Sequence, residues 1–258
     1  MSSAPRGPVP KTAAEIEAMA EAGAVLARCH DLMAAEVAVG VTTAHLDAIA
    51  EEYILSQGAV PAFKGYPGTT PFPASICPSV NDQVVHAIPG AYALRDGDVL
   101  SIDCGVVLDG WVADAARTYA VGAVTPIAAR LIESTRASLD RGIAACIVGN
   151  HVGDIGHAVQ AEVEAAGFAV VQSLVGHGVG RSMHEEPQVP NYGRPGSGPE
   201  LREGYVIAIE PMVNAGRHEV MLADDGWTIA TKDGSLSAHW EHTVAVTADG
   251  PRILTLAA

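Results

Sequence analysis

Five residues of types that divalent metals favour stand in separate apolar or glycine-rich segments of this chain. They are Asp103 in Leu-Ser-Ile-Asp-Cys-Gly, Asp114 in Val-Ala-Asp-Ala-Ala-Arg-Thr, His177 in Gly-His-Gly-Val-Gly-Arg, Glu210 in Ile-Ala-Ile-Glu-Pro-Met and Glu241 in His-Trp-Glu-His-Thr. Acids within apolar strands are costly to bury unless they are paired or bound to a metal. Four carboxylates balance the charge of two divalent ions. The set therefore predicts a buried two-metal site, although each residue alone could be an ordinary polar side chain.

Two of these acids belong to one predicted hairpin. The dipeptide Asp109-Gly110 is a strong signal for a two-residue type I′ turn. That turn pairs Asp103 with Ala116 and puts Asp114 on the same sheet face as Asp103, roughly 7–8 Å away diagonally across the strands. Two carboxylates at that separation can share a pair of ions. Cys104 points to the opposite face and is not expected to be a ligand.

Two further histidines could act on a substrate. His86 in Val-Val-His-Ala-Ile-Pro and His184 in Met-His-Glu-Glu-Pro could donate to a carbonyl oxygen or steady a leaving amine. A core histidine bonded to backbone is the plainer alternative for each. The remaining histidines outside the motifs are expected to have surface roles: His30, His45, His151, His157 and His218. No Gly-x-Ser-x-Gly or His-Glu-x-x-His motif is present, and no Lys-Ser/Thr completes a phosphate loop near His177.

The elements that must position these residues show capping signals and an internal repeat. Predicted helices open at the Thr12–Glu15 capping box, after Thr42-Thr43, at Thr125-Pro126, and at Asp154 as an N-cap. Gly40, Leu46, Ile54 and Gly58 recur 109 residues later as Gly149, Ile155, Val163 and Gly167. Two segments ending in an acid, 99–103 and 206–210, align at an offset of 107. The pattern predicts two halves, each with a helix and a strand that ends in a carboxylate. Coincidence among common residues is the alternative.

The bulk properties suit a globular enzyme. The chain has 258 residues, of which 48% are hydrophobic, and a net charge of −15 without any run of Lys or Arg. This charge argues against binding to nucleic acid or to anionic membranes. No apolar run is as long as a membrane span or a signal-peptide core. Four cysteines without close spacing favour reduced thiols, so we expect a cytoplasmic protein.

Two regions are expected along the chain. Residues 1–11 combine three prolines with small residues and are expected to form a flexible arm. The segment Pro5-Arg6-Gly7-Pro8 also fits a PxxP ligand. Residues 12–258 are expected to form a single catalytic domain.

Taken together, these segments resemble the type I methionine aminopeptidases, from about residue 13 to the C-terminus. The most specific pieces are those around Asp103, Asp114, His177 to His184, Glu210 and Glu241. The resemblance implies the α+β pita-bread (creatinase/aminopeptidase) fold. In this fold two pseudo-symmetric halves share a central antiparallel sheet with helices outside, and a dinuclear metal site lies between the halves.

The resemblance also implies a role for each site residue. Asp103 would chelate one ion, His177 and Glu210 the other, and Asp114 and Glu241 would bridge them. His86 would lie near the substrate amine and the scissile peptide, and His184 would bond the carbonyl oxygen as it becomes an oxyanion. Glu210 would carry a proton to the departing nitrogen. The family's pocket for the methionine side chain corresponds to Phe63, Tyr66, Phe72, Cys77, Met183 and Trp227. A monovalent cation near Asn81, Gln83 and Ser237 is a further implication.

This chain departs from the family's usual residues at several places. Val112-Ala113 replaces a His-Gly pair before the bridging aspartate, Met183 replaces a Phe, and His239 replaces a Gln. A few extra residues around Thr69-Thr70-Pro71 lengthen the pocket loop. None of these changes removes a predicted ligand, so they bear on the shape of the pocket and on inhibitor preference.

The implied function is removal of the initiator methionine from nascent proteins and peptides when the second residue is small. The implied setting is the maturation of nascent chains at the ribosome. Two ions of cobalt, manganese, iron or zinc would serve a monomeric enzyme. One rival is an Xaa-Pro aminopeptidase of the same fold, although such enzymes usually carry an extra N-terminal domain, and only about a dozen residues precede the match here. A non-catalytic peptide-binding or protein-binding module of that fold is the other rival.

Overall fold

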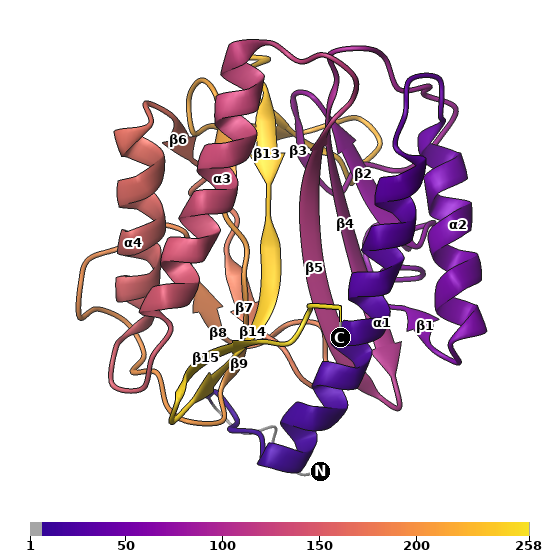
Figure 1. Cartoon of the computed structure of the whole chain (residues 1–258). Coiled ribbons are helices and arrows are strands. Elements are labelled where there is room, and N and C mark those ends of the chain that lie inside the picture. The colour runs from indigo at the N-terminus through magenta and orange to yellow at the C-terminus, as the bar shows by residue number, and fades with distance from the viewer. Residues whose placement is uncertain (1–6, 258) are drawn as a thin grey trace.

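Two pairs of helices enclose the strands of this protein, as Figure 1 shows. The structure, a computed structural model, describes residues 7–257, so the start of the PxxP segment, Pro5-Arg6, lies outside the described residues. Helices α1 (Ala13–Glu36) and α2 (Thr43–Ser56) lie on one side, and α3 (Pro126–Ala145) and α4 (Val152–Ala165) on the other. Within residues 7–257, no helix is both long and apolar enough to cross a membrane. The predicted arrangement of a central sheet with helices outside is confirmed.

The central sheet is antiparallel throughout. Nine strands of the described residues form it, in the order β1-β4-β5-β14-β9-β7-β8, with β2 beside β4 and β15 beside β14. Their bounds are β1 (Val60–Pro61), β2 (Ile76–Val80), β4 (Val99–Leu108), β5 (Trp111–Ala120), β7 (Gly176–Gly178), β8 (Glu185–Val189), β9 (Val206–Ile209), β14 (Glu241–Thr247) and β15 (Gly250–Ile253). Strands from both halves of the chain therefore meet where β5 pairs with β14.

Two small sheets complete the fold. One contains β6 (Ala169–Val170), β10 (Met212–Asn214) and β13 (Ser237–His239), and the other β3 (Gln83–Val85), β11 (Val220–Leu222) and β12 (Ile229–Thr231). In the chain, β10 and β13 are separated from β9 and β14, and β3 from β2, by only one or two residues.

Helix capping explains where the helices begin. The Thr12 hydroxyl accepts the Glu15 N–H and the Glu15 carboxylate accepts the Thr12 N–H, which completes the predicted capping box. Thr42 and Thr125 likewise cap α2 and α3 through their hydroxyl oxygens. The predictions for these three helix starts are confirmed.

Two details of the sequence prediction are wrong. Asp154 is not the N-cap of α4 but its third residue, and its carboxylate accepts the His151 N–H at 2.7 Å. Asp103 does not end its strand, because the hairpin continues β4 through Leu108. In both cases the acidic residue lies in the predicted element but not at the predicted boundary. The Asp154 carboxylate reaches back to the residue before the helix, and the tight turn after Leu108 lets β4 continue past Asp103.

The hairpin itself matches its prediction. Asp109 and Gly110 have φ values of 49° and 75°, the left-handed conformation that a type I′ turn requires. Asp103 lies opposite Ala116, and Gly105 lies opposite Asp114, so the two acids are diagonal neighbours on one sheet face. The type of turn therefore determines which face carries both carboxylates.

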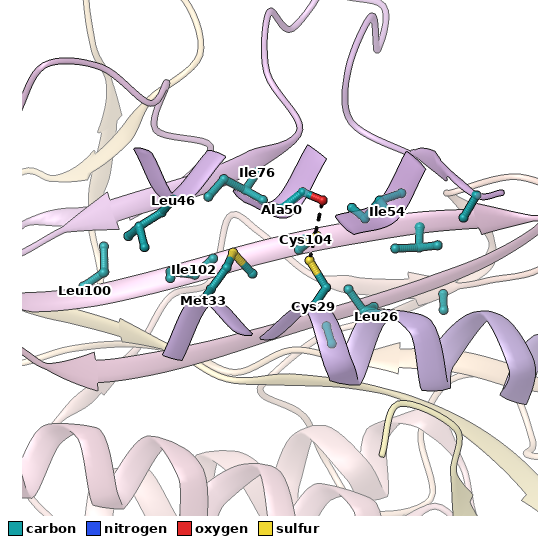
Figure 2. Packing of buried hydrophobic residues seen from close by; sticks show 14 of the residues in the cluster. Leu26, Cys29, Met33, Leu46, Ala50, Ile54, Ile76, Leu100, Ile102 and Cys104 are labelled. Atoms are coloured by element: carbon teal, nitrogen blue, oxygen red, sulfur yellow. Dashed lines mark hydrogen bonds between the residues drawn. The ribbon is translucent and has the colours of Figure 1, made fainter. Parts of the chain in front are cut away.

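The opposite face of β4 forms the core of the first half. Figure 2 shows Leu100, Ile102 and Cys104 of β4 packed against side chains of α1 and α2. All three are fully buried. Because successive side chains alternate across a strand, burying these residues under the helices turns Asp103 to the other face.

The second half repeats the first. Helices α2 and α4 each contain 14 residues, and their N-caps, Thr42 and His151, are 109 positions apart. The glycines before them, Gly40 and Gly149, share the same φ of 89°. Helices α3 and α4 pack on β9 and β14 through an apolar cluster of their own. The predicted duplication is confirmed by backbone conformation as well as by residue type.

Helix α1 approaches the C-terminal segment very closely at Gly23. A methyl group built there would overlap the carbonyl oxygen of Leu254, which is backbone and cannot move aside alone. The absence of a side chain at Gly23 therefore permits the contact between the first helix and the last residues of the fold.

We expect Gly23→Ala to lower the free energy of unfolding by about 1–3 kcal/mol, the usual cost of overpacking, despite the better helix propensity of Ala. Urea unfolding of the variant and the parent protein measures this difference. Glu21→Ala, on the exposed face of the same helix, serves as the control and is expected to change stability by no more than about 0.5 kcal/mol. Equal stability of the Gly23 and Glu21 variants would contradict the packing argument.

Candidate metal centre and active site

One cavity of about 190 Å³ gathers the residues that the sequence singled out. Its walls include the five candidate ligands Asp103, Asp114, His177, Glu210 and Glu241, the two candidate catalytic histidines His86 and His184, and the six candidate pocket residues Phe63, Tyr66, Phe72, Cys77, Met183 and Trp227. Val85, Leu174, Val175 and Met212 also line it. Sequence reasoning missed these four because an apolar residue with no chemical signature looks the same in a pocket wall as in the core.

Asp103 and Glu241 lie on two strands that are separated by a third strand, β5. Asp103 on β4 and Glu241 on β14 both lie opposite Ala116 on the intervening strand β5. Asp114 is two residues from Ala116 on the same strand, and therefore on the same face. The small side chain of Ala116 leaves open the space between the flanking carboxylates. Antiparallel pairing therefore brings Asp103, Asp114 and Glu241 together, and no hydrogen bond joins any two of them.

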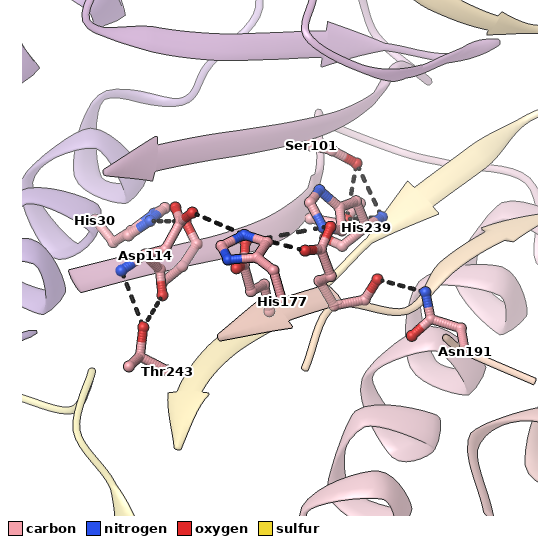
Figure 3. Close-up of polar contacts among 11 residues, drawn as sticks. His30, Ser101, Asp114, His177, Asn191, His239 and Thr243 are labelled. Atoms are coloured by element: carbon pink, nitrogen blue, oxygen red, sulfur yellow. Dashed lines mark hydrogen bonds and ion pairs between the residues drawn. The ribbon is translucent and has the colours of Figure 1, made fainter. Parts of the chain in front are cut away.

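His177 and Glu210, which belong to the second half of the chain, complete the set of candidate ligands. His177 lies on β7 and donates its Nδ1–H to the carbonyl oxygen of Gly178 at 2.9 Å, which leaves the Nε2 lone pair free. Nε2 lies 3.5 Å from Oε1 of Glu210 and 3.7 Å from Oδ2 of Asp114. Figure 3 shows the ring of His177 directed at Asp114. These separations suit atoms that contact a common ion, because each ligand lies about 2.0–2.2 Å from the metal.

The glycines beside His177 allow β7 to fit between its neighbours. A side chain at Gly176 would overlap the carbonyl oxygen of Ala208, and one at Gly178 would overlap that of Glu186. The glycine-rich motif therefore serves close strand packing, which brings the imidazole to the cavity.

The electrostatics of the cavity demand positive charge. Burial raises the pKa of Asp103, Glu210 and Glu241 well above their usual values, and the Asp114 carboxylate raises each further. Burial raises the pKa of Asp114 itself to about 7. Burial also lowers the pKa of His177 to about 4, so the imidazole is neutral and able to bind a metal.

Several buried polar atoms support the same conclusion. Among residues 7–257, Oδ1 of Asp103, Oδ1 of Asp114 and Oε1 of Glu241 have no hydrogen-bond partner. One donor atom from each of Asp114, His177 and Glu241 lies within 4.8 Å of the others. A mixed oxygen and nitrogen set with orphaned carboxylate oxygens fits divalent cations.

Two residues that the sequence did not single out hold the ligands in place. The Thr243 hydroxyl accepts the Asp114 N–H at 3.0 Å and donates to the Asp114 carbonyl oxygen at 2.8 Å. Asn191 donates its side-chain N–H to the carbonyl oxygen of Glu210 at 2.9 Å. Both are fully or almost fully buried, and Figure 3 shows them on either side of the centre. A buried Thr or Asn carries no periodic signal, so only tertiary contacts identify them.

The two candidate catalytic histidines line the cavity beside the acids. His184 lies at its rim, with its ring 4.3 Å from that of His177. Its Nδ1 is 2.7 Å from the hydroxyl of Tyr66, a contact that the sequence did not suggest. Partial burial lowers the pKa of His184, and burial lowers that of His86 to about 4, so both rings are neutral near pH 7.

The candidate side-chain pocket is aromatic and thioether-rich. Phe72 and Trp227 meet edge to face, with ring centroids 5.2 Å apart. The Trp227 indole donates to the carbonyl oxygen of Thr70 at 3.1 Å, so the loop around Thr69-Thr70-Pro71 contacts this wall directly. Cys77 lies opposite Asp103 on β2, which joins the apolar pocket to the acids.

The residues suggested for a monovalent cation lie together outside the main cavity. Asn81 has a left-handed φ of 58°, and its carbonyl oxygen accepts the Ser237 N–H at 2.8 Å. The Gln83 side chain accepts the Val80 N–H at 2.9 Å. These hydrogen bonds join the turn at Asn81 to Ser237 and Val80.

The surface role expected for His30 is wrong. Its side chain is fully buried beneath β5, and Nε2 donates to the carbonyl oxygen of Ala115 at 2.9 Å. Burial lowers the pKa of His30 to about 3. His30 continues the helical spacing of Ile16, Met19, Gly23 and Leu26 on the buried face of α1, so this periodicity was the signal that could have placed it correctly. That face packs on the strand behind the acids.

The model of the family described as "Metallopeptidase family M24" matches residues 17–248. The chain belongs to this family. It is 53% identical over 242 residues to "Methionine aminopeptidase" of Clostridium perfringens, which covers 94% of this chain and 96% of that protein. It superimposes on the crystal structure of methionine aminopeptidase from Rickettsia prowazekii with a TM-score of 0.94 and 42% identity, covering 96% of this chain and 100% of the other.

A more distant likeness concerns the fold alone. The prolidase from Pyrococcus horikoshii matches with a TM-score of 0.77 but 20% identity, over 97% of this chain and 64% of that one. Family membership and the methionine aminopeptidase relatives together make this chain a metallo-hydrolase with the pita-bread fold.

The raised pKa values predict that metal binding releases protons. Asp114 binds a proton in the metal-free folded state between about pH 3.8 and 7, where the unfolded chain does not. The free energy of unfolding of the metal-free protein therefore falls as the pH rises through this window, by up to about 1.4 kcal/mol per pH unit for this group. Calorimetric titration with Mn²⁺ at pH 6, in buffers of different ionisation enthalpy, should show proton release.

Asp114→Asn is the matched control, because it keeps the shape of the side chain and removes its titration. We expect it to release fewer protons than the parent protein at pH 6, provided that it still binds an ion. A binding heat that does not depend on the buffer would contradict raised carboxylate pKa values in the metal-free state.

Proposed function

We propose that this protein removes the N-terminal methionine from polypeptides by two-metal hydrolysis. One observation carries the proposal: an aromatic and thioether-lined pocket opens into the same cavity as four buried carboxylates and a neutral imidazole. An unbranched thioether side chain gains roughly 1.5–3 kcal/mol from burial in such a pocket. The acids beside it would hold both the metals and the free amine of the first residue.

Each acid has a distinct part in this proposal. Asp103 would bind one ion, and His177 with Glu210 the other, while Asp114 and Glu241 would contact both. Bound divalent ions would polarise the scissile carbonyl group and lower the pKa of the water between them. Cobalt, manganese, iron and zinc all suit this donor set. Glu210 would carry the proton from the attacking water to the leaving nitrogen.

His184 would bind the oxygen that becomes negatively charged. If the Tyr66 hydroxyl donates to Nδ1, the neutral ring carries its proton on Nε2 and can donate there. Preorganised donors of this kind stabilise the tetrahedral state more than the substrate. His86, whose neutral ring shares the cavity, would lie beside the amine and the scissile bond.

We further propose a domain organisation, a class of substrates and a cellular location that suit this activity. Residues 12–258 would act as one catalytic domain, and residues 1–11 as an arm that Lys11 joins to the domain through Glu185 at 2.6 Å. The substrates would be nascent chains in the cytoplasm, with a small second residue, and the enzyme would act as a monomer. A monovalent cation would bind the turn formed by Asn81, Gln83 and Ser237.

Activity against short peptides tests the proposal. After chelation, the protein should be inactive, and addition of Mn²⁺, Fe²⁺, Co²⁺ or Zn²⁺ should restore release of methionine from Met-Ala-Ser. Acetylated Met-Ala-Ser should resist cleavage, because a blocked amine cannot pair with the acids. Comparable or faster cleavage of Xaa-Pro peptides would point to the rival peptidase, and stable peptide binding without cleavage under every metal would point to a binding module.

Substitution of His184 tests its role in the reaction. His184→Ala should reduce kcat by roughly 10²–10³-fold, since a donor to the oxyanion is lost, while the metal content stays the same. Tyr66→Phe should reduce kcat by a smaller factor, roughly 2- to 10-fold, because it removes one hydrogen bond of about 1 kcal/mol and leaves the pocket apolar. Steady-state kinetics and metal analysis measure both effects. Wild-type turnover in His184→Ala would remove this residue from the mechanism.

A further inference from the structure

His239 has a buried imidazole ring with no bonded partner. It is the last residue of β13, it is 1% exposed, and neither ring nitrogen has a hydrogen-bond partner within residues 7–257. A buried polar group without a partner loses its hydrogen bonds to water and destabilises the fold. Such a ring therefore requires an explanation beyond packing.

The ring is aimed at the candidate metal centre. Its Nε2 lies 3.9 Å from Oε2 of Glu210 and 4.0 Å from Oε2 of Glu241. The other oxygen of Glu210, Oε1, is the one that lies near His177. His239 therefore faces the oxygen of Glu210 that is directed away from the His177 side of the centre.

The backbone of His239 is held firmly. Its N–H is within hydrogen-bond reach of the hydroxyl oxygens of Thr118 and Ser101, at 3.0 and 3.2 Å, and its carbonyl oxygen accepts the Thr118 hydroxyl at 2.7 Å. Figure 3 shows Ser101 and His239 joined in this way. Ser101 and Thr118 lie on β4 and β5, the strands that carry Asp103 and Asp114. The position of the ring is thus set by the same strands that set the acids.

A ring in this position can donate a hydrogen bond to the carboxylates. Carboxylates that bind a metal through one oxygen usually accept a hydrogen bond on the other, which fixes their orientation. A neutral imidazole offers one N–H, and Nε2 is the nitrogen that faces both acids. Separations of 3.9 and 4.0 Å need only a small movement of either side chain to become a hydrogen bond.

We propose that His239 is a positioning residue of the metal centre, whose single Nε2–H is shared between the Oε2 atoms of Glu210 and Glu241, as a bifurcated hydrogen bond, when metal is bound. This inference rests on the proposed two-metal site. His239 then sets the orientation of two ligands from one fixed point, and it raises the affinity of the centre for its ions without contacting them.

Metal binding by two variants of nearly equal size tests this role. His239→Gln keeps an N–H donor, and His239→Leu removes it. After chelation, the affinity for Co²⁺ is measured by calorimetry and the site is examined by the visible absorption of bound cobalt. We expect His239→Leu to weaken binding by roughly 10- to 100-fold and to shift the cobalt bands, and His239→Gln to stay within a few-fold of the parent protein.

Two results would overturn the proposal. Unchanged affinity and an unchanged cobalt spectrum in His239→Leu would mean that the ring has no influence on the centre. Equal loss in both variants would mean that the imidazole is itself a ligand. Circular dichroism and thermal unfolding of the metal-free variants separate either result from misfolding.

A measurement on the parent protein does not depend on how the variants fold. With ¹⁵N-labelled histidine and bound Zn²⁺, the His239 ring should carry its proton on Nε2, with the proton signal shifted by a hydrogen bond. A deprotonated Nε2 would refute the proposal. Because none of these experiments uses substrate, failure to cleave Met-Ala-Ser would count against the proposed function alone.

Discussion

The rest of this structure depends on one constraint. Gathering four carboxylates around one buried cavity has an unfavourable free energy. Burial raises the pKa of all four acids, and the charge of Asp114 raises the pKa of Asp103, Glu210 and Glu241 further, so the group is stable only with bound protons or bound cations. The protein places no Lys or Arg of residues 7–257 in the cavity wall to relieve this charge. The single ring nitrogen of His177 that faces the acids is neutral and can bind a metal. An apparently unfavourable cluster is therefore a prepared site for divalent ions.

The duplicated architecture makes this arrangement possible. Each half contributes a strand with an acid, and the two halves join where β5 pairs with β14. The contact is more than a shared sheet edge, because Thr243 of the second half bonds both the N–H and the carbonyl oxygen of Asp114 in the first. Helices cover the outer faces and bury the alternate residues of the same strands. The packing that stabilises each half therefore also turns the acids inward.

Apolar side chains adjoin the charged group in the same cavity. Cys77 lies beside Asp103 on the neighbouring strand, so the wall changes from apolar to acidic within one strand spacing. Trp227, held by the backbone of Thr70, and Phe72 close the apolar end. Under the proposed function, the apolar end would receive the side chain of the first residue, and the acids would receive its free amine.

Local patterns in the sequence determined much of this protein. The Thr12–Glu15 capping box, the Asp109-Gly110 turn and the offset of 109 residues between the halves are short-range signals, and each is satisfied by atoms only a few residues apart or by repetition. The turn alone put Asp103 and Asp114 on one face. Only the tertiary structure decided that Tyr66 contacts His184 and that Thr243, Asn191 and His239 surround the acids. These contacts join residues far apart in the chain, so they depend on how the sheets and helices pack, and no local pattern specifies that packing.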